Sequence, residues 1–318
     1  VLEEAQRLAD GLEAEDAQAQ ATTEELSDEE RIALMMGQWE ERQAEEYETY
    51  GDALVEALLD LHHERYEEAC RRLEALLDGA DHPRFLWLEV GRARLVNEDL
   101  EGGQVALEAF LGALDEGEAT EAKVNTNLML ARLADDGGRF EGAMLRCEAA
   151  VEGVPNGDRP YLAMGAFLRH KGHGEEALAV LQTSLELSQA NATDWRLLEE
   201  LGLVYEMTGK PKEALKFLEQ VIEFFTSRQV VDFPPDTATT LAKLYEEDGR
   251  ADRAADLYRA LSQGGDRERH ALYHFEAGRL LQGLGLDEES RRMLTRAEAL
   301  LGEEDDELRA KVAALLQG

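Results

Sequence analysis

Apolar and polar positions follow a helical period along most of the chain, and one short arrangement returns several times. In its clearest copy, Leu197–Gln220, the large Leu201 precedes the small Gly202, and the aromatic Tyr205 follows three residues later. Gly209 then interrupts the pattern before a second apolar stripe begins. Apolar residues three and four positions apart share one face of a helix. Each copy therefore predicts two amphipathic helices joined by a tight turn.

Seven copies can be aligned on one small residue near the start of the second helix. This residue stands at Ala69, Gly103, Ala143, Ala177, Ala214, Ala254 and Ser290. The copies are therefore 34, 40, 34, 37, 40 and 36 residues apart. Self-similarity at a period of roughly 20–50 residues is typical of helical solenoids. The predicted fold class is all-α, a solenoid of antiparallel helix pairs.

The boundaries of the helix pairs follow from the same register. We expect first helices at Ala53–His63, Phe85–Val96, Lys123–Asp135, Tyr161–His170, Trp195–Thr208, Thr237–Glu247 and Ala271–Gly283. We expect second helices at Tyr66–Leu77, Gly103–Leu114, Phe140–Val151, Gly174–Ser188, Lys212–Phe225, Ala251–Gln263 and Asp287–Leu301. Five of the turns carry a glycine five residues before the aligned small residue. A positive φ, which such a turn needs, has no steric cost for glycine. The second repeat has Glu98 at this position.

The two ends of the chain depart from the repeat. Residues 1–50 hold 16 acidic and 3 basic residues, and two helices fit there. One spans Leu2–Ala19, and the other opens on a capping box at Ser27–Glu30. We interpret 1–50 as a degenerate repeat or cap, with a loose acidic extension as the alternative for the first helix. Residues 51–301 form the solenoid, and 302–318 form a C-terminal capping helix.

The pattern resembles the tetratricopeptide repeat family over roughly 53–301. Residues at the family's large, small and aromatic positions include Trp87, Val90, Gly91, Gly165, Leu201, Gly202, Tyr205, Leu241, Ala242, Tyr245 and Gly278. The resemblance implies a right-handed superhelix of about seven repeats with terminal capping helices, whose first helices line a concave groove for a peptide or protein. Intervals of 37 and 40 residues exceed the family's usual period of about 34.

Charge and composition limit the classes of partner that the protein can bind. The net charge is −36, from 69 acidic and 33 basic residues, so phosphate backbones and anionic lipid surfaces are repelled. The acidity fits either a basic partner or a salty environment. Two cysteines without a paired framework favour a reducing compartment. No apolar stretch approaches the roughly 18–20 residues of a membrane span. We therefore expect a cytoplasmic protein, although a leader or anchor upstream of residue 1 stays open.

The resemblance places the residue after each small residue on the groove. Those residues are Arg92, Arg132, Ala166, Leu203, Lys243 and Arg279, and four of the six are basic. Asn125, Arg159 and Arg196 lie near the starts of the same helices. One hypothesis is an interrupted basic stripe that receives carboxylates, because a guanidinium holds a carboxylate by two parallel hydrogen bonds. The alternative is that these bases pair with acidic residues of neighbouring repeats.

An apolar groove is a second hypothesis. Its candidates are Phe85, Leu88, Leu128, Leu162, Leu203, Leu272 and Phe275. Exposed together, such residues would form a patch of the kind that marks a partner site, whereas the alternative is packing within the repeats. The Lys and Asn set of the family's carboxylate clamp is not matched beside Asn125 and Asn127.

Catalytic and cofactor signals are weak. His270 and His274 stand four apart on a predicted helix, but no third metal ligand accompanies them. No phosphate-binding glycine loop or nucleophile motif appears. We therefore predict a non-catalytic interaction scaffold or adaptor without metal or cofactor, which binds a protein or peptide in its groove. The alternative is a permanent assembly or regulatory subunit of a larger machine that uses its convex or end surfaces.

Overall fold

The computed structural model describes residues 27–115, 121–154, 157–188, 194–228, 230, 233–264, 267–302 and 305–317. Regular structure in these ranges is helical, and the ranges contain no strand. The chain divides into two compact units, Val1–Asn156 and Gly157–Gly318. This division falls inside the solenoid that the sequence predicts for 51–301. Each unit is described by itself below.

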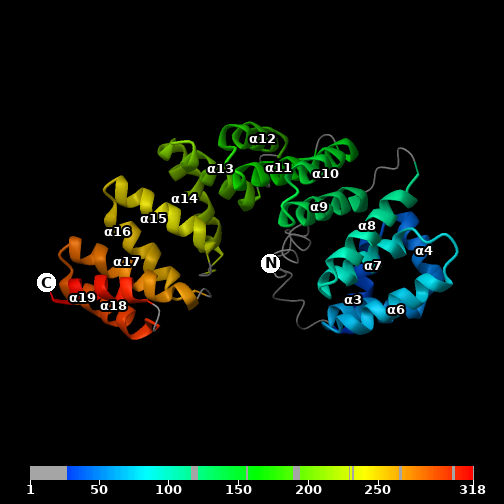
Figure 1. Cartoon of the computed structure of the whole chain (residues 1–318), viewed down its shortest axis with the longest axis horizontal. Helices are drawn as coiled ribbons and strands as arrows, with labels where there is room; N and C mark the ends of the chain where they lie inside the picture. Colours follow the sequence, from blue (N-terminus) through cyan, green and yellow to red (C-terminus); the bar gives the residue numbers. More distant parts are fainter. Residues whose placement is uncertain are drawn as a thin grey trace. The chain divides into compact units, whose positions relative to one another are not determined.

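In the described part of unit 1, two helices precede three helix pairs (Figure 1). The helices are α3 (Asp28–Gln38), α4 (Glu41–Tyr50), α5 (Asp52–His62), α6 (Tyr66–Gly79), α7 (Phe85–Val96), α8 (Leu100–Ala113), α9 (Glu121–Asp136) and α10 (Phe140–Gly153). The first helices of the pairs are α5, α7 and α9, and each packs mainly on the second helix that follows it.

Unit 2 contains four helix pairs and a final helix. They are α11 (Arg159–His170), α12 (Gly174–Leu187), α13 (Trp195–Met207), α14 (Pro211–Ser227), α15 (Pro235–Glu247), α16 (Ala251–Leu261), α17 (His270–Gly283), α18 (Asp287–Leu300) and α19 (Asp306–Gln317). The 3-10 turn η2 (Arg267–Arg269) precedes α17. Together the units confirm the all-α fold of seven antiparallel helix pairs that the sequence predicts.

A glycine in the first helix meets a leucine sixteen residues later in the second helix. A Cβ added to Gly202 would lie 2.4 Å from a methyl of Leu218, and one added to Gly165 would lie 2.4 Å from Leu181. The same arrangement occurs at Gly91 against Leu107 and at Gly278 against Leu294. The missing side chain lets the two helices approach until the leucine fills the space above the glycine. The small residue of the sequence pattern is thus a helix-packing position.

The turn within each pair requires a left-handed residue. All five predicted turn glycines have positive φ, from 71° at Gly209 to 82° at Gly172. Glu98 adopts the same conformation with φ 66°, and Glu64 does so in the first pair with φ 60°. A side chain in this region clashes with the following carbonyl, so glycine is preferred there. The backbone geometry of the turn is therefore kept even where the sequence lacks its preferred residue.

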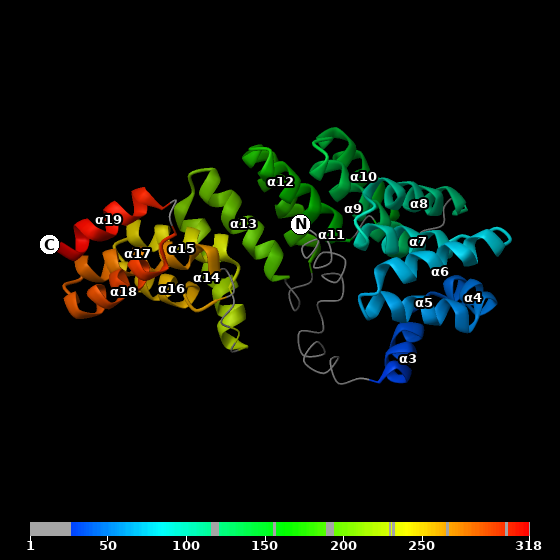
Figure 2. The same ribbon diagram turned by 60° about the horizontal axis from the view of Figure 1, so that its bottom comes forward.

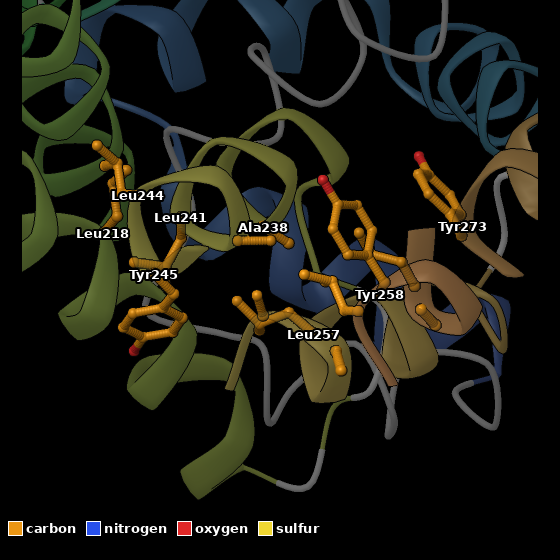
Figure 3. Close-up of a cluster of buried hydrophobic side chains, with 14 of the residues drawn as sticks. Leu218, Ala238, Leu241, Leu244, Tyr245, Leu257, Tyr258 and Tyr273 are labelled. Atoms are coloured by element: carbon orange, nitrogen blue, oxygen red, sulfur yellow. The ribbon is translucent and has the colours of Figure 1, made fainter. Parts of the chain in front are cut away.

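One hydrophobic cluster of unit 2 extends from α14 to α17. Figure 3 shows Leu218 of α14, Leu241 of α15 and Tyr258 of α16 in one cluster, together with Tyr273 of α17. At the end of the unit, Val312 of α19 is fully buried and packs on the cluster around Leu294. The predicted C-terminal helix is therefore present and covers apolar residues of α17 and α18.

The N-terminal region differs from the expectation in one respect. The capping box at Ser27 is present, with the backbone N–H and the hydroxyl of Ser27 both donating to Glu30. The helix it opens ends at Gln38, and a further helix, α4, follows directly. The predicted helix Leu2–Ala19 lies outside the described residues.

Candidate functional site

The functional candidates lie on one side of the first helices. We use the term first-helix face for the side that carries the residue after each small residue. In unit 1 this face belongs to α5, α7 and α9, and in unit 2 it belongs to α11, α13, α15 and α17. The two faces are treated separately.

In unit 1 the basic candidates pair within their own helices. Arg92 lies 3.3 Å from a carboxylate oxygen of Glu89, whose side chain is buried. Arg132 lies 3.2 Å from Asp136, one turn further along α9. Asn125 is half-buried on α9. The two guanidiniums are therefore already engaged by carboxylates of the same helix.

In unit 2, Arg279 bridges two helices. Its guanidinium donates to both carboxylate oxygens of Glu246 on α15, at 2.8 and 2.7 Å, and to Glu276 on α17 at 2.8 Å. The hydrogen bonds to Glu246 hold the pKa of Arg279 above its usual range and lower the pKa of Glu246. Pairing between neighbouring repeats, the alternative to a free basic stripe, is thus present at Arg279.

Two further arginines of unit 2 lie at helix starts. Arg196 is half-buried, 4.9 Å above the Trp195 ring and 3.7 Å from Asp194. Arg159 is half-buried at the start of α11. Lys243 differs from these residues because its side chain is exposed on α15, and no carboxylate within the described part of the chain pairs with it.

The apolar candidates separate into two groups. Phe85, Leu88 and Phe275 are buried, with exposed fractions of 1%, 0% and 6%, so their expected place on an open groove is wrong. They fill the space between helices, where large side chains gain most from leaving water. Leu128, Leu162 and Leu203 are half-buried, and Leu272 is exposed.

A partly buried acid lies between first helices of unit 2. The Thr237 hydroxyl of α15 donates to Glu199 of α13, and burial raises the pKa of Glu199 to about 7. The neighbouring Glu200 is held by Arg169 of α11, at 2.5 and 2.9 Å. The sequence gives no signal for this group, because a Glu-Glu pair on a helix has the same pattern as a solvated surface pair.

The structure adds a feature that the sequence motifs do not show, namely the placement of α4. This helix packs on the first helices α5 and α7. Figure 2 shows it beside α5. Its Tyr47 is buried and donates to the Glu89 carboxylate at 2.6 Å, and Glu89 in turn pairs with the groove candidate Arg92. The part of the first-helix face that α5 and α7 form in unit 1 is therefore contacted by a segment of the same chain. The spacing of Gln43, Tyr47 and Tyr50 is the signal that could have indicated a buried side of α4.

The described ranges offer few groups suited to metal binding or nucleophilic catalysis. They contain no group of three His, Cys, Asp or Glu residues placed to hold a metal ion. His270 contacts the carbonyl of Gly264 at 3.0 Å, and burial lowers the pKa of His274. Cys147 is buried, which raises the pKa of its thiol to about 12 and makes it a poor nucleophile at neutral pH. Among the described helices, none has the length and apolar character that crossing a membrane requires.

Repeated helix pairs, in which a small residue of the first helix lets a large residue of the second helix approach closely, define a helical-repeat protein. The model of the tetratricopeptide repeat family matches residues 159–227, and the remaining helix pairs have the same construction, so the chain has the fold of tetratricopeptide repeat proteins. Proteins of this fold serve in general as non-catalytic scaffolds for protein–protein interaction. No curated protein matches the sequence significantly.

Solved structures with this fold resemble the chain at low identity. PilF of Pseudomonas aeruginosa is 20% identical with a TM-score of 0.57, and the match covers 73% of this chain and 96% of PilF. YrrB, described as having an unusual peptide-binding site, is 20% identical with a TM-score of 0.50 over 65% of this chain and 99% of YrrB. A chain of the APC/C hetero-tetramer Cut9-Hcn1 is 16% identical with a TM-score of 0.56, covering 83% of this chain and 48% of that one.

Proposed function

We propose that the protein is a non-catalytic adaptor that binds a peptide or protein segment on the first-helix face of unit 2. One observation carries the proposal. On this face Leu162 and Leu203 are half-exposed and Lys243 is exposed, whereas Arg279 and Arg169 are neutralised by Glu246 and Glu200. Among the described residues of this face, a partner thus meets apolar side chains and the cation of Lys243. A segment with apolar residues and a carboxylate fits this combination.

The neutralised pairs favour an apolar mode of binding. Breaking the Arg279–Glu246 pair to bind a partner carboxylate would exchange one ion pair for another with little net gain. Burying Leu162 and Leu203 removes apolar surface from water without such a loss. The similar protein YrrB, described as peptide-binding, gives a precedent for this use of the fold.

Site-specific crosslinking tests the proposal. A photo-reactive amino acid at Leu203 should capture a partner segment in cells of the source organism, and the same group at the exposed Lys212 of α14 should not. Lys243→Glu should lower the yield of that partner at least threefold, whereas Lys212→Glu, the same charge change on a second helix, should leave it unchanged. Equal capture at both positions would rule out binding on the first-helix face.

A different observation favours the alternative of a permanent subunit. Second helices of unit 1 expose large apolar side chains: Leu100 and Val105 on α8, and Leu145 on α10 at 65% exposure. Apolar residues on these helices suit a lasting contact with another subunit. The resemblance to a chain of the Cut9-Hcn1 assembly is consistent with such a role.

Size and stoichiometry separate the two functions. A free adaptor elutes alone from size-exclusion chromatography of the native protein, whereas a permanent subunit elutes with partners in fixed ratio. For the permanent subunit, Leu145→Glu should release those partners, and Lys243→Glu should not. Retention of the partners by Leu145→Glu would exclude a contact through α10.

A further inference from the structure

The helix α4 does not pack like a helix of the repeats. In the pairs of unit 1, a second helix such as α6 packs on its own first helix and on the next one, α7. Helix α4 instead packs on the two first helices α5 and α7, and its end residue Glu40 reaches α9. It thus lies against the face that the first helices present, where the family resemblance expects a partner.

We propose that α4 is a built-in ligand of the first-helix face of unit 1, and that a partner binds this face with an acidic, tyrosine-bearing helix that displaces α4. The inference rests on the proposed role of first-helix faces in binding. It concerns unit 1, whereas the proposed adaptor site lies in unit 2.

Helix α4 places a carboxylate at the start of α7. The backbone N–H groups of Arg84, Phe85 and Leu86 all donate to the carboxylate of Glu46, at 3.0–3.1 Å. The first N–H groups of a helix lack partners within that helix and carry a partial positive charge. A carboxylate is therefore recognised here by backbone groups, which any acidic partner residue in this position could use.

A second carboxylate of the same segment makes the equivalent contact on the next first helix. The backbone N–H of Glu121, at the start of α9, donates to Glu40 at 3.0 Å. Glu40 and Glu46 thus span the starts of α7 and α9. Two successive first helices therefore bind two acids that lie six residues apart on one segment. A ligand whose acids have a different spacing could not make both contacts.

The aromatic side chain of Tyr47 lies between these acids and the core. Tyr47 is 2% exposed and packs edge-on against Trp39, with ring centroids 4.9 Å apart, and against Phe85. Its hydroxyl donates to Glu89, which explains why Glu89 is tolerated in a buried position. An aromatic ring in a desolvated pocket is the usual centre of a protein–protein contact. A ligand for this face therefore needs a tyrosine directly after its second acid.

Helix α4 can dissociate from this face while the helix pairs stay folded. Only Gln43 and Tyr47 of its ten residues are buried, and Gly51, with φ 55°, joins it to α5. The helices α5 to α8 contribute most of the cluster around Phe85 and Leu107 without it. A tethered ligand competes at an effective concentration on the order of 1 mM, so a partner is excluded unless it binds tightly or α4 is weakened.

Peptide binding to the full chain tests the proposal. The probe is a fluorescein-labelled peptide with the sequence of residues 39–51, measured by fluorescence anisotropy. Glu46→Gln/Tyr47→Ala in the protein should release α4 and lower the apparent Kd of the probe at least tenfold relative to the unchanged protein. Glu48→Gln/Thr49→Val, at exposed neighbouring positions, is the matched control and should leave the apparent Kd unchanged. An equal apparent Kd for all three proteins would overturn the proposal.

The probe itself supplies a second control. A peptide carrying the same two substitutions as the released protein should bind that protein at least tenfold more weakly than the unchanged peptide. Equal binding of both peptides would show nonspecific association and would also overturn the proposal.

Hydrogen exchange distinguishes a ligand from an integral part of the fold. In Glu46→Gln/Tyr47→Ala, amide exchange should rise in α4 and in the first turn of α7, while the centres of α6 and α8 keep their protection. Loss of protection throughout α5–α8 would mean that α4 belongs to the folded core, which contradicts the proposal. Neither outcome depends on Lys243 or Leu203, so the adaptor site in unit 2 stands or falls separately.

Discussion

At the scale of single residues, the fold depends on where side chains are absent. Four first helices carry a glycine that contacts a leucine sixteen residues later. In the three other pairs the position holds Ala57, Ala131 or Ala242. The sequence pattern identifies these positions as small, and the structure adds their partners. Because the neighbouring leucine is tightly enclosed, each glycine should tolerate even a methyl group poorly.

A methyl group at Gly202 tests this packing. We expect Gly202→Ala to lower the free energy of unfolding by about 1–3 kcal/mol, since the new Cβ would overlap Leu218 and force α13 and α14 apart. Gly112→Ala is the matched control because nothing lies within 4 Å of its added Cβ. It should stabilise α8 by about 0.5–1 kcal/mol through helix propensity alone. Urea unfolding measures both, and equal effects at the two positions would contradict the packing argument.

The left-handed turns give a second test at the residue scale. Glu64 and Glu98 occupy positions that are glycine in the other five pairs, and both have positive φ. We expect Glu64→Gly and Glu98→Gly each to raise the free energy of unfolding by about 1 kcal/mol, because the clash of Cβ with the backbone is removed. Glu101→Gly, within α8, is the control and should destabilise. Thermal unfolding followed by circular dichroism measures the difference, and a lowered Tm in both turn variants would contradict the argument.

At the scale of elements, polar side chains connect neighbouring first helices in unit 2. Arg169 joins α11 to α13, Thr237 joins α15 to α13, and Arg279 joins α17 to α15. The repeat register places the basic candidates on a common face, but it does not show that acids from the next repeat meet them. Whether acids and bases meet depends on the rotation of each helix about its own axis. That rotation depends on how the large side chains pack between neighbouring helices.

The acid between α13 and α15 predicts a pH dependence. Desolvation raises the folded-state pKa of Glu199 to about 7, above the usual value for an exposed glutamate. The hydrogen bond from Thr237 and the charge of Arg169 lower this pKa, whereas Glu200 and Asp236 raise it. The folded state thus binds this proton more tightly than the unfolded state. Stability from this group is greatest at low pH and declines as pH rises from about 4.5 through about 7.

Glu199→Gln should remove that decline. It keeps an oxygen that accepts from the Thr237 hydroxyl and never ionises. We expect it to raise the free energy of unfolding at pH 8 by on the order of 1–2 kcal/mol and to have little effect near pH 4.5. Glu206→Gln, an exposed residue on the same helix, is the control. Urea unfolding at several pH values measures the slope, and an effect of Glu199→Gln that does not vary with pH would contradict the assignment.

At the scale of the whole molecule, the excess of acids affects stability as well as the choice of partner. A net charge of −36 on 318 residues makes the compact state repel itself. Local ion pairs such as Arg279 with Glu246 relieve this repulsion only where a base is available. The remaining acids interact over distances that salt screens.

Salt should therefore stabilise the protein. We expect Tm to rise by several degrees between about 0.02 and 0.5 M NaCl, because screening of repulsion outweighs the weakening of the surface ion pairs. Thermal unfolding in an equal osmolality of a neutral sugar is the control for nonspecific exclusion. A Tm that falls with NaCl would show that the ion pairs dominate over the general repulsion.

The sequence by itself determined the helices of the seven pairs, their pairing, the turn positions and the small packing residues, because these follow from local periodicity and from contacts sixteen residues apart. It also predicted the face on which Lys243 and Arg279 lie. Only the tertiary structure decided that Phe85, Leu88 and Phe275 are buried, that Arg279 is neutralised by Glu246, and that α4 packs on α5 and α7. These contacts join residues from about 30 to 80 positions apart, such as Glu40 with Glu121, and their formation depends on how the helices are rotated against each other. Local periodicity does not contain that information.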